Sequence, residues 1–393
     1  MIKHIKINNY KSLIDFSLSL TPLTVIVGNN AAGKSTILQA IDFMCRSVQE
    51  DFISILDNRG LKIENIKSKL APASAPVRFE AEIEIEESGE TYNYLWEMEI
   101  NTRIAKNSIW LQEEKIKDLN CEKYLLSYGK SVESCIWDDE KNETIQLPEI
   151  MSYQSSVLKM INGEAGTRLS ILKRFLMNSS SFELLSPDEM RMSSRGWADT
   201  IGMSGRTLPS FIKGMPQEKK QRFMKKIQQL LGDTIENVGT RTQARPGWTQ
   251  VVLTESYENK KVSVASKDIS DGTLRLLAFV AISEIQKPEA VMLLDEIENG
   301  INTNYAEKLL DILRGAWKEK RHQMIVTTHS TAFLDYVEGK EIVFLYRDKQ
   351  TGVTCGSTLF DIPKLKEKLD YMYPGEVILN YTNEKLVEIL LKH

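Results

Sequence analysis

The chain has 393 residues, of which 42% are hydrophobic and 26% are charged, and its formal net charge is −4. This length accommodates one large core with a subdomain, or two domains. The net charge argues against a uniformly basic nucleic-acid binder, although not against a local basic patch. Four scattered cysteines indicate neither a zinc site nor a disulfide framework, and no stretch approaches the roughly 18 apolar residues of a membrane span. We therefore expect a cytoplasmic protein without membrane contact.

The N-terminal segment contains the most specific motif. Residues 1–27 alternate apolar and polar side chains, which predicts strands, and a helix is expected over 35–49. Between them lies a complete Walker A loop, Gly-x4-Gly-Lys-Ser, whose backbone N–H groups and helix N-terminus favour one anion. Lys34 would neutralise phosphates and Ser35 would ligate Mg²⁺. The loop is thus predicted to bind a nucleotide through Gly28, Asn29, Asn30, Ala31, Ala32, Gly33, Lys34, Ser35 and Thr36.

The middle of the chain changes character. Residues 50–76 have no clear pattern and are expected to form helix or loop. Apolar and acidic residues alternate over 77–147, which predicts an antiparallel β-meander. Helices are expected over 155–178 and 208–231, with a short strand at 181–185 between them. The second helix carries five cations within eight residues, at positions 219, 220, 222, 225 and 226. Such a face is either solvated or follows a nucleic-acid backbone, and the pattern leaves both readings open.

The last third alternates strands and helices. Strands are expected over 249–267, 290–296, 324–328 and 341–346, helices over 273–286 and 304–320, and a helical tail at the end. Around a P-loop this order predicts an α/β fold, a P-loop NTPase with a mostly parallel sheet flanked by helices. The β-meander and a compact mixed helical insert complete it. We divide the chain into an N-terminal ATPase lobe at 1–150, a mainly helical insert at 151–248 and a C-terminal ATPase lobe at 249–393.

Two strand ends and the loop that follows the first of them indicate the chemistry, and this loop, Glu298-Asn299-Gly300-Ile301-Asn302, is expected to reach across a dimer seam. Asp295 and Glu296 end a buried strand, where Asp295 can hold Mg²⁺ through water and Glu296 can act as the general base. His329 follows the next strand and can hydrogen-bond the γ-phosphate. Lys34, Glu296 and His329 are therefore the predicted catalytic residues.

A second anion site is predicted at the start of helix 273–286. Ser270 and Gly272 offer a hydroxyl and free N–H groups there. The ordinary alternative is an N-cap. Since one nucleotide needs one P-loop, we expect this helix end to meet a γ-phosphate bound by another subunit.

These motifs, together with Asn9-Tyr10-Lys11-Ser12, come in the order of ABC-type ATPase heads. The chain resembles the SMC/RecF/OLD-like branch of AAA-family ATPases, most clearly over residues 1–50 and 265–347. The resemblance implies a head-to-head homodimer, or a higher oligomer, that encloses two ATP with Mg²⁺. Lys11 and Ser12 would lie beside the nucleotide, and Ser270 and Gly272 would act in trans. Gln154 is a candidate Mg²⁺-sensing glutamine or an ordinary surface residue.

The chain also lacks parts of its relatives. No sustained heptads occur between 50 and 265, so no long coiled coil is expected. Glu338-Gly339 is similar to the start of a Toprim nuclease domain, but no Asp-x-Asp pair follows to bind two metals. We therefore expect a stand-alone ATPase that acts through another protein.

The resemblance favours an ATP-hydrolysing switch that controls a separate effector, a nuclease or toxin, in an anti-phage defence system. The alternative is a RecF-like DNA-binding ATPase of repair and recombination. Its DNA contact would be the basic face at 219–226, with Arg191, Arg195, Arg206 and Arg241. A third reading is an ATP-dependent scaffold that does not hydrolyse ATP.

Overall fold

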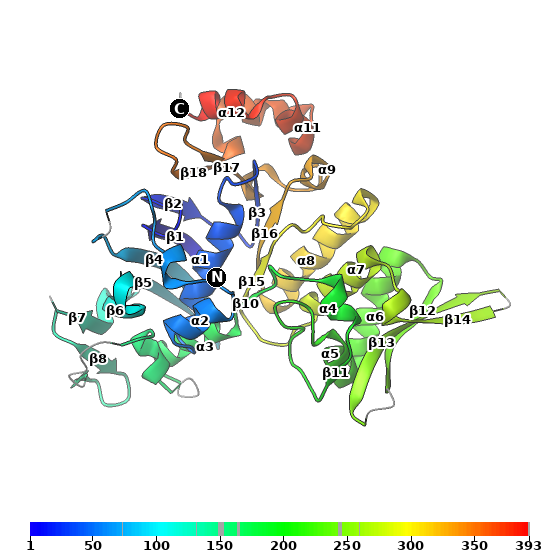
Figure 1. The fold of residues 1–393 in the computed structure, drawn as a ribbon, viewed down its shortest axis with the longest axis horizontal. Coiled ribbons are helices and arrows are strands. Elements are labelled where there is room, and N and C mark those ends of the chain that lie inside the picture. The colour runs from blue at the N-terminus through cyan, green and yellow to red at the C-terminus, as the bar shows by residue number, and fades with distance from the viewer. Residues whose placement is uncertain are drawn as a thin grey trace.

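A computed structural model describes residues 1–72, 74–130, 132–147, 153–162, 166–242, 246–258 and 260–391. Within these residues the chain forms two large sheets and one smaller sheet, with helices between and around them (Figure 1). The α/β class predicted from the sequence is confirmed. No helix in the described ranges is long and apolar enough to cross a membrane.

The predicted β-meander is confirmed and belongs to a larger antiparallel sheet. The two N-terminal strands extend it to the order β2-β1-β4-β5-β6-β7-β8-β9. One face is apolar and buried, with Phe79 and Trp96 among its residues, whereas the other carries ion pairs such as Lys6–Glu80. The strands are β1 (Ile2–Asn8), β2 (Phe16–Ser19), β4 (Val77–Glu87), β5 (Glu90–Arg103), β6 (Ser108–Asp118), β7 (Lys123–Gly129), β8 (Cys135–Asp138) and β9 (Glu143–Gln146).

The second sheet is the predicted mostly parallel one. Its order is β10-β15-β16-β3-β17-β18, and only the pairing of β17 with β18 is antiparallel among the described strands. The P-loop strand β3 therefore lies between two strands from the last third of the chain. The strands are β3 (Leu23–Gly28), β10 (Ser180–Ser181), β15 (Val291–Leu294), β16 (Gln323–Thr328), β17 (Ile342–Arg347) and β18 (Thr354–Thr358).

The parallel sheet separates two hydrophobic cores. Leu293 and Ile325 belong to the core that contains α1 and the meander, whereas Leu294 and Val326 belong to the core that contains α7 and α8. Both faces of these strands are buried, which explains their continuous apolar runs. The helices are α1 (Lys34–Arg46), α2 (Phe52–Asp57), α3 (Arg168–Asn178), α4 (Pro187–Arg191), α5 (Leu208–Gly214), α6 (Gln217–Leu231), α7 (Asp271–Ser283), α8 (Ala306–Lys320), α9 (Thr331–Leu334), α10 (Pro363–Lys366), α11 (Pro374–Leu379) and α12 (Asn383–Leu390).

Several predicted boundaries are wrong. The helix expected over 208–231 is two helices, α5 and α6, because Pro216 has no N–H and holds Met215 in an extended conformation. Of the helix expected over 155–178, only a 3₁₀ turn at Val157–Met160 and α3 are helical, while residues 163–165 lie outside the described ranges. The strand expected at 181–185 has only the two residues of β10.

The third sheet lies at the lower right of Figure 1. Its strands are β11 (Ser194–Arg195), β12 (Ile235–Thr242), β13 (Trp248–Tyr257) and β14 (Lys260–Ala265), and the sequence patterns did not predict β12. Helices α5 and α6 pack against β12. The three-part division of the chain stays a prediction.

Candidate nucleotide site

The P-loop follows β3 and packs tightly against neighbouring backbone. A Cβ at Gly28 would lie 2.2 Å from the carbonyl oxygen of Leu345, and one at Gly33 would lie 2.5 Å from Thr354 Oγ1. Gly33 also has a φ of 109°, which favours glycine. Both glycines of the motif are therefore required by close approach within the chain.

The Lys34 side chain is held by backbone carbonyl oxygens of the P-loop itself. Its Nζ donates to the carbonyl oxygens of Gly28 at 2.8 Å and Asn29 at 3.1 Å, and lies 3.4 Å from His329 Nδ1. Burial lowers the pKa of Lys34, while Asp295, Glu298 and Glu296 oppose this shift. A phosphate group in the loop would restore the counter-charge that burial requires.

A pocket of about 740 Å³ opens above the loop. This is the size range of small-molecule sites. Gly28, Asn29 and Ala32 belong to the loop but do not line the pocket. The predicted site residues that do line it are Lys11, Ser12, Asn30, Ala31, Gly33, Lys34, Ser35, Thr36, Asp295, Glu296 and His329.

The ends of β15 and β16 are joined by hydrogen bonds. Thr327 Oγ1 donates to Asp295 Oδ1 and accepts from the backbone N–H of Glu296 at 2.9 Å. Glu296 has a φ of 48°, a strained conformation of the kind found at functional sites. The two carboxylates are therefore fixed relative to β16, which precedes His329.

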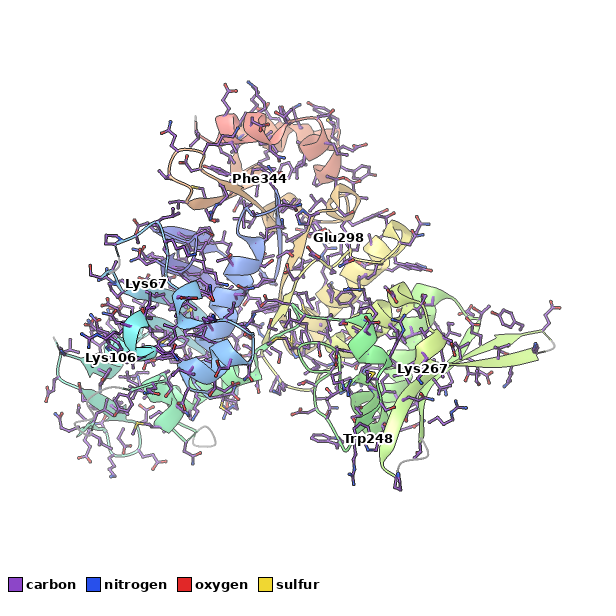
Figure 2. All side chains as sticks on the ribbon, viewed as in Figure 1. Lys67, Lys106, Trp248, Lys267, Glu298 and Phe344 are labelled. Carbon is purple, nitrogen blue, oxygen red and sulfur yellow. The ribbon has the colours of Figure 1, made fainter. Side chains whose placement is uncertain are left out.

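Glu298 is a third carboxylate at this site. Its Oε1 accepts from the backbone N–H of His329 at 2.6 Å, and its buried Oε2 has no hydrogen-bond partner among the described residues. The sequence placed Glu298 only in a loop after the carboxylate pair. Its position two residues after Glu296 was the available signal. Figure 2 shows Glu298 beside the strands of the parallel sheet, with Lys67 on the N-terminal lobe.

Other residues around the P-loop had no local sequence motif. Thr354 Oγ1 donates to the carbonyl oxygen of Ala32 at 2.9 Å and lies 2.8 Å from Ser12 Oγ, so it supports the loop from behind. Arg347, Lys67 and Lys69 bring further positive charge to the pocket. They come from β17 and from the weakly patterned segment 50–76, and only the tertiary fold brings them to the loop.

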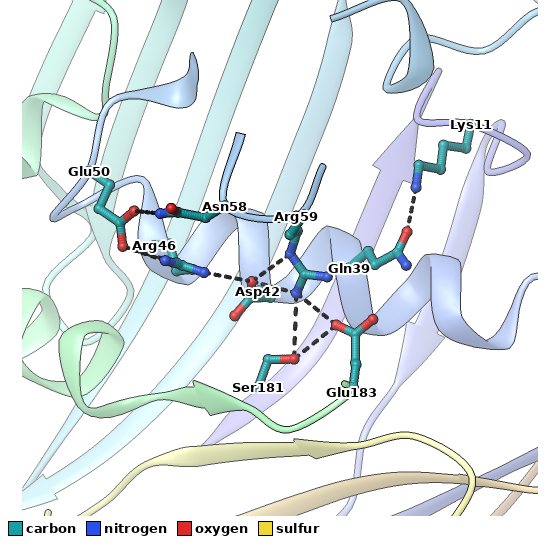
Figure 3. A network of polar contacts seen from close by, with 9 residues as sticks. All are labelled: Lys11, Gln39, Asp42, Arg46, Glu50, Asn58, Arg59, Ser181 and Glu183. Carbon is teal, nitrogen blue, oxygen red and sulfur yellow. Dashed lines mark hydrogen bonds and ion pairs between the residues drawn. The ribbon is translucent and has the colours of Figure 1, made fainter. Parts of the chain in front are cut away.

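Lys11 lies at the edge of a polar network (Figure 3). Lys11 Nζ donates to Gln39 on α1. Asp42 lies further along α1, and Arg59, which follows α2, donates to its Oδ2. Arg59 also donates to Glu183 Oε1 at 2.7 Å. All three of these side chains are at most 5% exposed. The network joins the P-loop helix to the segment that follows β10.

The pocket has suitable ligands for Mg²⁺ bound together with a nucleotide. Ser35 and Asp295 line it together, and the described residues contain no group of three or more His, Cys, Asp or Glu side chains that would form a metal cage. Mg²⁺ commonly uses one or two protein ligands, substrate phosphates and water. Ser35 and Asp295 would hold the ion, which supplies positive charge to the phosphates.

Gln154 does not reach this pocket. Its carbonyl oxygen accepts from the backbone N–H of Phe52 at 2.8 Å, and the nearby N–H of Ser156 donates to Ser47 at 3.1 Å. Ser47 caps the C-terminal end of α1. Since α1 has 13 residues, this end lies about 20 Å from the P-loop. Gln154 is exposed there, so in this chain it does not lie with Ser35 and Asp295, the other predicted metal ligands.

The N-terminus of α7 lies outside the pocket lining. Ser270 is exposed and its Oγ accepts from the N–H of Thr273 at 3.2 Å, as an N-cap does. A Cβ at Gly272 would lie 2.5 Å from the carbonyl oxygen of Gly300, in the loop after the carboxylates. Arg191 pairs with Asp271 and supports this turn. In one chain, the P-loop and the exposed helix end are therefore separate surfaces.

The basic face predicted at 219–226 is largely occupied by contacts within the chain. Lys219 is buried with its Nζ 4.4 Å from the centre of the Phe211 ring. Lys226 and Arg222 pair with the fully buried Glu284, at 2.7 and 3.4 Å. The face as predicted does not offer five free cations to DNA.

The chain matches the family model of the AAA ATPase domain over residues 1–334 and belongs to that family. It is 40% identical over 72 residues to the OLD nuclease of Thermus scotoductus (strain ATCC 700910 / SA-01), a match that spans 16% of this chain and only 14% of that nuclease.

Its fold is that of an SMC head. The solved SMC head bound to the C-terminal winged-helix domain of ScpA aligns with a TM-score of 0.51 and 15% identity, covering 91% of this chain and 96% of that one. The SMC head domain of Thermotoga maritima aligns with a TM-score of 0.45 and 15% identity, covering 91% and 98%. The chain is thus an SMC/OLD-like AAA ATPase, a P-loop NTPase in fold.

Proposed function

We propose that this chain is an ATP-hydrolysing switch that closes as a homodimer around two ATP and controls a separate effector protein. The supporting observation is the division of the motifs. One pocket collects the P-loop, Asp295, Glu296 and His329, while the exposed N-terminus of α7 lies outside it. A second copy is needed to bring an α7 end to the phosphates.

Within this proposal each side chain has a separate task. Lys34 leaves the carbonyl oxygens that it contacts and binds the terminal phosphates, and Ser35 with Asp295 holds Mg²⁺. Glu296 accepts a proton from the attacking water, and His329 binds the γ-phosphate. Ser270 and the N–H groups of α7 in the second copy complete the site.

The test is the mass of the protein in solution with and without ATP. Glu296→Gln keeps the shape of the side chain but removes the base, so we expect a stable dimer with ATP and little hydrolysis. Ser270→Arg should bind ATP yet stay monomeric, because the change blocks only the contact in trans. The proposed homodimer around two ATP is wrong if Glu296→Gln remains monomeric with ATP.

The effector is a further part of the proposal. The match to part of an OLD nuclease supports a nuclease as this partner, supplied by a separate chain, and the role in a defence system is part of the proposal. Co-purification of this chain with the product of its neighbouring gene, with mass measured with and without ATP, would identify such a partner. A neighbouring protein that binds equally in both states would contradict control by ATP.

A further inference from the structure

A second hollow in the molecule has the opposite charge character from the acidic meander. A groove of about 450 Å³ lies between the α5–α6 connection and the sheet of β12, β13 and β14. Figure 1 places α5 and β13, which border this groove, well away from α1 and β3. Three cations, Lys213, Lys220 and Arg241, line it, together with Gln217, Asn237, Thr240 and Ser263.

These three cations differ from their neighbours on α6. Lys219 contacts the Phe211 ring, and Arg222 and Lys226 form ion pairs with Glu284. In contrast, no ion pair of Lys213, Lys220 or Arg241 occurs within the described residues, and no acidic side chain lines the groove. Of the nearby acids, Asp199 acts on the buried Lys219, and Glu218 is outside the lining. Three uncompensated positive charges around one hollow attract an anion.

An exposed aromatic residue packs against the helix that carries part of the groove lining. Trp197 is 72% exposed, which is unusual for so large an apolar side chain. A Cβ at Gly214 would lie 2.6 Å from its ring, so the indole lies against Gly214, between the lining residues Lys213 and Met215. Cations that follow a backbone beside an aromatic platform are the combination that binds single-stranded nucleic acid.

We propose that this groove binds the phosphate backbone of single-stranded nucleic acid. Lys213, Lys220 and Arg241 contact phosphates, the polar side chains of β12 and β14 contact sugars and phosphates, and one base stacks on Trp197. The groove is large enough for one or two nucleotides. A single strand can contact these residues without the major or minor groove of a duplex. The site is separate from the nucleotide pocket, so it does not depend on the proposed switch.

The experiment measures anisotropy of a labelled oligothymidine of about 20 nucleotides with the full chain, over a series of salt concentrations. The test variant is Lys213→Gln/Lys220→Gln/Arg241→Gln. The matched control, Lys106→Gln/Lys225→Gln/Lys267→Gln, removes three exposed cations outside the groove. Figure 2 shows two of these, Lys106 and Lys267, on different lobes. Thermal melting of both triple variants checks that they remain folded.

We expect the groove variant to bind about tenfold or more weakly and the salt slope to fall by about 2, since each phosphate contact on a single strand contributes about 0.7. The control variant should stay within about threefold of wild type, and Trp197→Ala should weaken binding about fivefold or more. Equal binding by the two triple variants would overturn the proposal. Tighter binding of a duplex than of the single strand, with no effect of Trp197→Ala on the duplex, would also overturn it. Full competition by thymidine monophosphate at equal nucleotide concentration would do the same. Hydrolysis of ATP without nucleic acid should be equal in wild type and both triple variants, so loss of the proposed ATPase is distinguishable from failure of this site.

Discussion

At the scale of single residues, the site depends on hydrogen bonds between two strand ends. Thr327 fixes Asp295 and Glu296, and Glu298 fixes the backbone at His329. None of these bonds has a sequence signature, because each joins residues about 30 positions apart. The sequence predicted which side chains gather at this site, whereas it did not predict the hydrogen bonds that hold them in place.

Glu298 is the residue for which this restraint can be measured. We expect Glu298→Ala to lower kcat for ATP about tenfold or more with a smaller change in KM, because it removes a charge-assisted hydrogen bond of about 1.5–3 kcal/mol that positions His329. Glu298→Gln retains an acceptor for the His329 N–H and should recover part of kcat. If both variants hydrolyse ATP like wild type, Glu298 does not position His329.

Glu114 gives a prediction for pH dependence. It is fully buried, and burial raises its pKa from 4.5 to about 6, although Ser156, Val157 and Trp96 donate to it at 2.6, 2.7 and 2.8 Å. The folded chain thus binds this proton more tightly than the unfolded chain. Its contribution to stability is present below pH 4.5 and is lost as the pH rises through about 6, by about 2 kcal/mol.

Urea unfolding of wild type and Glu114→Gln at several pH values measures this effect. The difference in free energy of unfolding between the two proteins should change by about 2 kcal/mol between pH 4.5 and 7. A difference that is the same at every pH would show that Glu114 titrates normally in the folded chain.

At the scale of elements, two helices contain glycines that differ in the space available for a side chain. Gly272 lies in the first turn of α7, where a Cβ would meet the carbonyl oxygen of Gly300 at 2.5 Å, whereas Gly315 in the middle of α8 has nothing within 4 Å of such an atom. The same substitution should therefore have opposite effects at the two positions.

We expect Gly315→Ala to raise the free energy of unfolding by about 0.5–1 kcal/mol, because alanine loses less backbone entropy in a helix. Gly272→Ala should lower it by about 1–3 kcal/mol, since backbone must shift. Chemical denaturation of both variants measures the contrast. Two stabilised variants would mean that the loop at Gly300 moves aside freely.

At the scale of the whole molecule, Arg59 links the two cores. It pairs with Asp42 on α1 and with Glu183 after β10, and all three side chains are nearly excluded from water. Phe182, next to Glu183, belongs to the core of α7 and α8, whereas α1 belongs to the other core. Removing one member leaves buried charges without a partner.

We expect Arg59→Met to lower the free energy of unfolding by about 3–5 kcal/mol. Arg78→Met is the control, because Arg78 pairs with Glu99 on the surface at 61% exposure, and such pairs contribute about 0–1 kcal/mol. Denaturation midpoints compare the two variants. Equal losses would show that the Arg59 network is not coupled to the stability of the fold.

The sequence alone determined the class of this protein. Walker A geometry needs particular residues at fixed spacing within one strand, loop and helix, and the meander follows from alternation along each strand. Such local signals need no distant contacts. They predicted the parallel sheet and the residues Lys34, Ser35, Asp295, Glu296 and His329 of one pocket.

Only the tertiary structure decided which other residues share that pocket and which do not. Gln154 lies at the far end of α1, Arg347 reaches the pocket from a strand near the end of the chain, and Lys226 on the basic face of α6 pairs with a buried glutamate. The reason is physical: ion pairs, burial and hydrogen bonds across hundreds of residues depend on how elements pack, and packing of that range leaves no periodic pattern in the chain.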